Sequence, residues 1–190
     1  MARLVLLVIA ASIACGAPAP TLAGTDLGSG SAPDFTLTDG RTGTRLALSS
    51  LRARVVVLSF LYTRCPDICP LTAERFRVTQ EALGEDAEEV VFLAVSADPA
   101  NDTPQAVQEF SRAHGLDRNW HYLIGTRAQL ANVWSAYGIV ATPDEGRPTV
   151  THTDAVYLID RQGRERVLLR TDALDKSLLH DLRVLLKEET

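Results

Sequence analysis

The sequence contains few cysteines, no block of like charge and no apolar run long enough to cross a membrane. Three cysteines in 190 residues are too few for a small fold held together by disulfides. The 24 acidic and 19 basic residues are scattered, so the positive surface typical of nucleic-acid-binding proteins is missing. The apolar stretch over residues 4–16 falls short of the ~20 residues that span a bilayer. These absences exclude a disulfide-stapled miniature and disfavour a nucleic-acid partner.

The chain does contain enough apolar material for one globular domain. Hydrophobic residues make up 46% of it and charged residues 23%, which is close to the average for globular proteins. A chain of this length usually forms a single core, and no internal repeat is visible. Since such a core is stable without disulfides, a pair of cysteines in it is expected to have a chemical role, such as redox reactivity or metal binding.

The amino-terminal segment has the pattern of an export signal. Residues 1–14 combine the positive charge of Arg3 with an apolar run and small residues. Residues 12–15 (SIAC) resemble a bacterial lipobox, in which the cysteine takes a lipid and becomes the new amino terminus. We therefore predict a signal peptide over residues 1–14, a lipidated Cys15, and a location on the extracytoplasmic (periplasmic) face of the bacterial cell membrane. Simple cleavage and an uncleaved anchor are the alternatives.

The rest of the chain divides into a tether and a domain. Residues 15–32 are rich in Gly, Pro, Ala and Ser, which predicts a flexible tether. Over residues 33–190, short β-branched apolar runs alternate with helical patterns, as is typical of an α/β domain. Residues 55–62 and 90–96 are nearly all apolar, which predicts neighbouring central strands covered on both faces. Periodicity also predicts helices over residues 102–115, 130–138 and 174–185, and a β-hairpin from residues 155–159 and 167–169.

A pair of cysteines follows the strongest predicted strand in the sequence CPDICP, residues 65–70. Apolar residues at helical spacing begin at Cys69, so both thiols are expected at a strand-to-helix turn. Unpaired N–H groups and the dipole at a helix amino terminus favour the thiolate. We therefore predict that Cys65 and Cys69 are reactive. A structural disulfide is the alternative, although closing a loop of about five residues removes only ~2 kcal/mol of chain entropy.

The spacing of the two cysteines also suits a metal ion. With three residues between Cys65 and Cys69, both sulfurs can face one point from successive turns. Such a pair can bind one soft ion, and Cu(I) and Zn(II) are the first-row ions that prefer sulfur. His152 is the best candidate for a third ligand, because its loop leads into a strand at the edge where loops of an α/β sheet meet. An ordinary surface histidine is the alternative.

Other polar residues have plainer interpretations. Asp67, between the cysteines, either tunes the thiolates or caps the helix. Asp98 ends a predicted strand and is expected to form a turn with the following proline. His114 and His180 suit predicted helices, whereas His121 is a candidate for a fourth ligand.

Three blocks of the sequence resemble one known family. Residues 60–70 (FLYTRCPDICP) resemble the metal-binding signature of the Sco/SenC copper-binding proteins, which serve the assembly of cytochrome c oxidase. Residues 96–104 (SADPANDTP) and 151–160 (THTDAVYLID) are similar to the family's second block and to its histidine block, in the family's order. The resemblance runs from about Pro33 to the end. It implies a thioredoxin-like α/β fold, with a central mixed sheet flanked by helices and an inserted hairpin.

The resemblance also implies a function. It implies copper, as Cu(I) and Cu(II), bound by Cys65, Cys69 and His152. It further implies delivery of copper to, or thiol reduction of, the dinuclear CuA centre of cytochrome c oxidase subunit II. We also expect a copper donor protein upstream, and the lipid predicted on Cys15 would anchor the protein in the membrane. A metallochaperone of this kind is not a classical enzyme.

Two functions are compatible with the same residues. One is a copper metallochaperone. The other is an extracytoplasmic thiol-disulfide oxidoreductase that reduces the CuA-site cysteines of its partner, in which Cys65 attacks a disulfide and Cys69 resolves the intermediate. A thiol peroxidase is disfavoured because residues 62–65 (YTRC) lack the Thr-x-x-Cys spacing. His152 separates the two, since only metal binding requires it.

Overall fold

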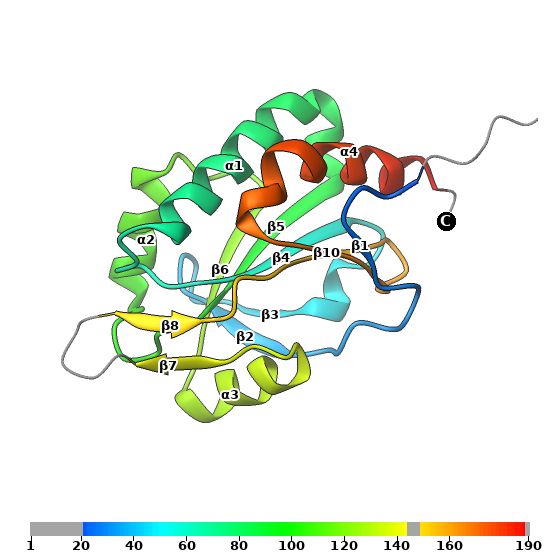
Figure 1. Ribbon diagram of the computed structural model, residues 1–190. Coiled ribbons are helices and arrows are strands. Elements are labelled where there is room, and N and C mark those ends of the chain that lie inside the picture. Colours follow the sequence, from blue (N-terminus) through cyan, green and yellow to red (C-terminus); the bar gives the residue numbers. More distant parts are fainter. Residues whose placement is uncertain (1–20, 144–148, 189–190) are drawn as a thin grey trace, which may run out of the picture.

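A mixed β-sheet forms the centre of the protein, which the computed structural model describes over residues 21–143 and 149–188. Its eight strands follow the order β1-β10-β9-β4-β5-β6-β2-β3 (Figure 1). Neighbours β4, β5 and β6 run parallel, and the other neighbouring pairs are antiparallel. The strands are β1 (Thr25–Asp26), β2 (Thr36–Asp39), β3 (Arg45–Ala47), β4 (Val55–Leu61), β5 (Val90–Ser96), β6 (Trp120–Ile124), β9 (Val156–Ile159) and β10 (Glu165–Leu169).

A separate hairpin and the helices surround this sheet. The hairpin pairs β7 (Ala141–Pro143) with β8 (Val150–His152) and is inserted between a helix and β9. One face of the sheet packs against three α-helices and the other against α3, which lies below the sheet in Figure 1. The helices are α1 (Ile68–Leu83), α2 (Pro104–Ala113), α3 (Arg127–Ala136) and α4 (Leu174–Lys187), with short 3₁₀ turns η1 (Leu48–Leu51), η2 (Gly84–Glu89) and η3 (Thr171–Ala173).

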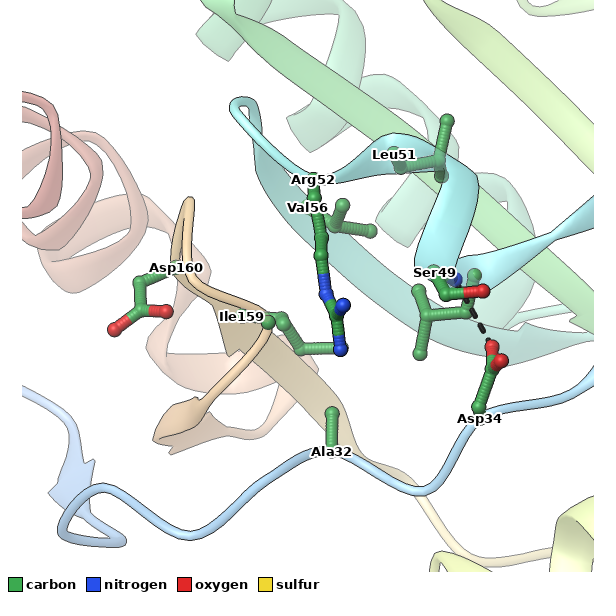
Figure 2. A pocket seen from close by; sticks show the side chains of 10 residues that line it. Ala32, Asp34, Ser49, Leu51, Arg52, Val56, Ile159 and Asp160 are labelled. Carbon is green, nitrogen blue, oxygen red and sulfur yellow. Dashed lines mark hydrogen bonds between the residues drawn. The ribbon is translucent and has the colours of Figure 1, made fainter. Parts of the chain in front are cut away.

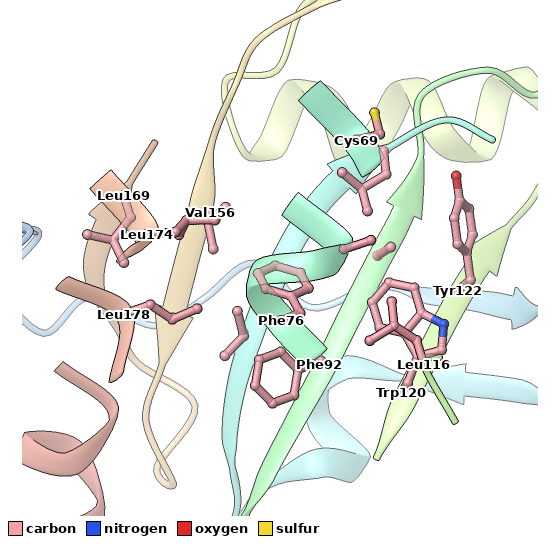
Figure 3. Close-up of a cluster of buried hydrophobic side chains, with 14 of the residues drawn as sticks. Cys69, Phe76, Phe92, Leu116, Trp120, Tyr122, Val156, Leu169, Leu174 and Leu178 are labelled. Carbon is pink, nitrogen blue, oxygen red and sulfur yellow. The ribbon is translucent and has the colours of Figure 1, made fainter. Parts of the chain in front are cut away.

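The two central strands are buried on both faces. Every residue of β4 and β5 is buried, and the two strands are parallel neighbours, as predicted. Side chains of β4 alternate between the two cores, so Val57 joins the cluster under α1 and Leu58 the cluster over α3. In the first cluster Phe76 of α1 lies against Phe92 of β5, with ring centroids 5.2 Å apart (Figure 3). The sheet is therefore a firm base for loops at its carboxyl edge.

The predicted helices and hairpin are confirmed. Helices α2, α3 and α4 lie within one to three residues of the predicted ranges, and β9 and β10 form the predicted antiparallel hairpin. Gly138 follows α3 with a φ of +63°, the left-handed conformation that suits glycine after a helix. Thr103 caps α2 by accepting from the Ala106 N–H, whereas the preceding Asp102 is buried.

The predicted boundary between tether and domain at residue 32 needs correction. Strand β1 pairs with β10 at the sheet edge, and the buried Asp181 carboxylate accepts from the Ala23 and Gly24 N–H groups at 2.6 and 2.9 Å. A Cβ on Gly24 would come within 2.4 Å of the Leu169 side chain, so a larger residue there would force β10 side chains to shift. Residues 21–32 therefore belong to the domain, because their backbone groups find partners there.

The predicted signal peptide over residues 1–14 and the lipidated Cys15 lie outside the described residues. In the part of the chain that the structure describes, no helix is both long and apolar enough to cross a bilayer.

Candidate functional site

The two cysteines lie where the most buried strand passes into a helix. Strand β4 ends at Leu61 and α1 begins at Ile68, so Cys65 lies in the connecting loop and Cys69 in the first turn of α1. Pro70 is compatible with this first turn, where an N–H has no helical partner to lose. Asp67 occupies the N-cap position, but its side chain makes no capping hydrogen bond. The strand-to-helix turn predicted for both thiols is confirmed.

Both cysteines are free thiols, with opposite surroundings. Cys65 is half-buried and Cys69 fully buried. The Cys69 backbone N–H donates to the Cys65 sulfur at 3.3 Å. The Cys69 side chain, followed by the backbone of Asp67 and Cys69, lowers the pKa of Cys65 to about 5, against an opposing effect of burial. The same bond to Cys65, together with burial, raises the pKa of Cys69. Cys65 is thus the thiolate of the pair and Cys69 the proton carrier.

His152 reaches the cysteines from the separate hairpin. It ends β8, and its Nε2 lies 3.9 Å from the Cys69 sulfur across 83 residues of sequence. Its Nδ1 lies 2.9 Å from the Thr153 carbonyl oxygen. Because a carbonyl oxygen only accepts, Nδ1 carries the proton and the Nε2 lone pair is free to face the sulfur. This is the tautomer in which a metal ligand is usually held by its other nitrogen.

Tyr62 lines the same place. Its ring packs edge-on against the His152 ring, with centroids 5.7 Å apart. Burial, and bonding to Cys65, raise the pKa of Tyr62 to about 12, so its hydroxyl stays protonated. A cleft opens here between the cysteine loop and β8, and its lining includes Cys65, His152 and Asp154. The cleft gives an ion or a partner access to Cys65 and His152, whereas Cys69 lies buried behind them.

The site residues are close but do not enclose an ion as they stand. Over residues 21–143 and 149–188, no three His, Cys, Asp or Glu side chains are gathered tightly enough to hold a metal ion. The Cys69 thiol keeps its proton, because its bond to Cys65 and its burial raise its pKa. Two sulfurs and an imidazole are nonetheless the donor set that suits a soft copper ion once that proton leaves.

A buried aspartate behind the cysteine loop was missed from the sequence. The Asp102 carboxylate accepts from the Thr63 N–H and hydroxyl at 2.8 and 2.7 Å, from Ser96 at 2.6 Å and from Tyr122 at 3.1 Å. Burial raises its pKa, and these four bonds oppose that rise. Thr63 lies two residues before Cys65, so Asp102 ties the loop to β5 and β6. The sequence offered one indication of this role, because Asp102 lies in residues 96–104, the second block that resembles the family. There it was interpreted only as the start of a helix.

The other candidates contact different parts of the fold. The His121 Nδ1 lies 2.8 Å from the buried Asp39 on β2, so its described partner is not a cysteine. The His114 ring packs on Phe110, and His180 Nε2 bonds the Thr21 carbonyl oxygen. Their described contacts therefore support structural roles.

Asp98 contacts a turn, and a second cavity is lined by other residues than the cleft at Cys65. The Asp98 carboxylate accepts from the Asn101 side chain at 2.7 Å, as in a turn. The cavity shown in Figure 2 lies under η1, where Asp34 accepts from the Ser49 N–H at 2.9 Å and Arg52 crosses the opening. Its lining contains neither cysteine nor histidine. The chemistry of the chain is concentrated at the cleft beside α1.

A model of the SCO1/SenC family matches residues 25–187 of the chain. The chain belongs to the SCO1/SenC family. This SCO1/SenC protein is 31% identical over 137 residues to a putative copper-binding protein of Stutzerimonas stutzeri, covering 68% of this chain and 66% of that one. The chain spans just under two thirds of the length of the first such relatives.

Solved structures of SCO1/SenC proteins share the fold. Apo Sco1 from Thermus thermophilus is 26% identical, with a TM-score of 0.76 over 89% of this chain and 99% of that one. ScoI from Bradyrhizobium japonicum, solved with copper bound, is 29% identical, with a TM-score of 0.70 over 80% and 96%. The predicted thioredoxin-like α/β fold is confirmed.

Proposed function

We propose that this SCO1/SenC protein is a copper metallochaperone that carries one copper ion on Cys65, Cys69 and His152. The observation that carries the proposal is the approach of His152 Nε2 to the Cys69 sulfur at 3.9 Å, while Nδ1 is held by the Thr153 carbonyl oxygen. Thiolate sulfur suits Cu(I), and imidazole accepts both Cu(I) and Cu(II). The copper-bound state of the related ScoI supports this cargo.

Each residue of the site has its own role in the proposed copper binding. Cys65 is already a thiolate and offers the first sulfur. Cys69 gives up its proton when the ion binds, and the Thr153 carbonyl keeps the His152 ring turned with Nε2 toward the sulfurs. Because the cleft is open on one side, a partner with similar ligands can exchange with these groups one at a time.

The recipient we propose is the dinuclear CuA centre of cytochrome c oxidase subunit II, with a separate copper donor protein. Family membership supports this destination. A lipid on Cys15 would hold the protein at the periplasmic face of the membrane, where such a recipient is exposed.

Disulfide exchange is a second candidate, favoured by the low pKa of the accessible thiol. The Cys65 thiolate would attack a partner disulfide, form a mixed disulfide and release one partner thiolate. Cys69 would then lose its proton and attack Cys65, releasing the second partner thiolate and leaving a Cys65–Cys69 disulfide. Two electrons pass to the partner, and His152 takes no part.

An anaerobic titration of the reduced protein with Cu(I), and separately with Cu(II), tests the proposal. We expect one equivalent to bind in each state, with intense sulfur-to-Cu(II) absorption. His152→Ala should abolish or shift that absorption. His180→Ala is the matched control, because His180 bonds the Thr21 backbone instead of the cleft.

Two outcomes of this titration would contradict the chaperone proposal. If binding ignores His152, or if Cu(II) only oxidises the thiols to a disulfide, the chaperone proposal fails. The protein would then act as a thiol reductase.

A further inference from the structure

A chain of hydrogen bonds joins the helix that carries Cys69 to the loop that follows His152. The Asp154 carboxylate accepts from the Thr171 N–H, with 3.1 Å to Oδ2, and from the Thr171 hydroxyl, with 2.8 Å to Oδ1. The same Thr171 hydroxyl oxygen lies 2.9 Å from the hydroxyl oxygen of Thr72, one turn after Cys69 on α1. We call these three residues the Thr72–Thr171–Asp154 chain.

The direction of this chain follows from its proton count. A carboxylate only accepts, so the single hydroxyl proton of Thr171 goes to Asp154. The contact between the two hydroxyls then requires Thr72 to donate to Thr171. Thr72 also lies 3.0 Å from the Ile68 carbonyl oxygen, which shares the same proton. Each hydroxyl proton and both carboxylate oxygens are thereby used.

The two threonines of the chain are enclosed by the protein, whereas Asp154 reaches the cleft. Thr72 and Thr171 are 1% and 3% exposed. Hydrogen bonds in such surroundings are stronger than in water, and an unpaired member is costly. The chain therefore fixes three segments, α1, η3 and the loop between β8 and β9, relative to one another.

The hairpin that carries His152 needs such a connection. Strand β8 pairs with β7 and belongs to a two-stranded sheet apart from the main one. Two-stranded hairpins are marginally stable alone. Packing of Tyr62 on the His152 ring restrains the ring, while the loop two residues later is bonded to η3.

We propose that Asp154, acting through Thr171 and Thr72, is a positioning residue that holds His152 at ligand distance from Cys69. The proposal rests on the copper-binding function above. Asp154 lines the cleft, and both of its oxygens accept hydrogen bonds from Thr171, which holds the carboxylate toward η3. Residues that orient a metal ligand usually change affinity by about 10-fold to 100-fold.

A double-mutant cycle on copper affinity tests the proposal. We expect Asp154→Ala to weaken Cu(I) binding by about 10-fold to 100-fold in the protein with His152. In the His152→Ala background the same change should alter affinity by less than about twofold, since the residue it positions is gone. An equal loss in both backgrounds overturns the proposal and makes Asp154 a ligand or a general stabiliser.

A matched control separates this chain from helix packing in general. Asp175 joins α4 to α1 through an ion pair with Arg75 at 2.6 Å, without involving the loop after His152. Asp175→Ala should leave copper affinity within about twofold, because exposed ion pairs contribute little. If Asp154→Ala fails to fold, Thr171→Val removes only the hydroxyl, and its effect should likewise vanish in the His152→Ala background.

Amide hydrogen exchange of the metal-free protein provides a readout independent of copper. Asp154→Ala should speed exchange at the Thr171 amide and at the Thr153 amide, which bonds the Val140 carbonyl, by about tenfold. Amides of β4 should not change. If His152→Ala leaves copper binding intact, the proposed function fails, while this exchange experiment still decides whether Asp154 holds the hairpin. Unchanged exchange at both amides overturns the positioning role.

Discussion

The two halves of the site are held by different kinds of structure. The cysteine half extends from β4, in which every residue is buried, and its loop is tied down by the buried Asp102. The histidine half lies on a hairpin outside the main sheet, beside Val140, which is 65% exposed. Segments with few buried contacts open more easily than core strands. The thiols therefore lie in the more deeply buried half of the site, and His152 lies in the half outside the main sheet.

Removing a thiol should have the largest effect on binding. Cys69→Ala deletes the buried sulfur that His152 Nε2 approaches at 3.9 Å, and we expect Cu(I) affinity to fall on the order of a thousandfold, or about 4 kcal/mol. Competition with a chromophoric chelator measures the loss. Thr79→Ala, buried further along α1, serves as the control. Retained tight binding would show that Cys69 is not a ligand.

Removing the Asp102 carboxylate, which bonds the cysteine loop, should chiefly lower the stability of the protein. Asp102→Ala leaves the Thr63 N–H and several hydroxyls without an acceptor, which should lower the free energy of unfolding by about 3 kcal/mol. Urea unfolding measures this value. A loss below about 1 kcal/mol, the scale of one ordinary hydrogen bond, would mean that the cysteine half is not anchored there.

Removing the imidazole should have a smaller effect than removing a thiol. His152→Ala should weaken Cu(I) binding by about a hundredfold, because two sulfurs remain to hold the ion. Stability of the metal-free protein should change little, since the ring is only partly buried. Chelator competition and urea unfolding check the two statements. If His152→Ala lowers Cu(I) affinity as much as Cys69→Ala does, the two halves of the site contribute equally to binding, and this prediction is wrong.

Lowering the pH should protonate the Cys65 thiolate and slow its reactions over a defined pH range. Because its pKa is lowered to about 5, the thiolate fraction should be constant near neutrality, half at about pH 5, and fall tenfold per pH unit below that. Cys69, whose pKa is raised, should stay unreactive throughout. Rates of alkylation, resolved by peptide mass spectrometry, test both. A midpoint near the ordinary thiol value of about 8.5 would contradict the proposed pairing.

The smallest effect is expected at the edge of the histidine half. Val140→Ser changes an exposed side chain next to β7 and should alter the free energy of unfolding by no more than about 0.5 kcal/mol. Val57→Ser in β4 is the matched change in the buried half and should cost several times more. Equal costs in urea unfolding would show that the hairpin is packed as firmly as the sheet.

Much of this architecture can be predicted from local patterns. Apolar runs identify β4 and β5, helical spacing identifies the helices, and CPDICP places both cysteines at a strand-to-helix turn. These features depend on neighbours a few residues apart, where side-chain period and backbone preference act directly. Residues 21–32 were misjudged because their Gly-rich composition indicates flexibility, whereas their partners on β10 and α4 lie more than 100 residues away.

By itself, the sequence determined the order of elements, the place of two thiols at a strand-to-helix turn and the blocks that resemble one family. Only the tertiary structure decided that His152 faces the thiols while His121 faces Asp39, and that Asp102 turns inward to hold the cysteine loop. It also placed Asp154 between Thr171 and the β7–β8 hairpin, which carries His152. The reason is physical: hydrogen bonds across 17 to 99 residues form only after the sheet brings distant loops to one edge, and no local period encodes them.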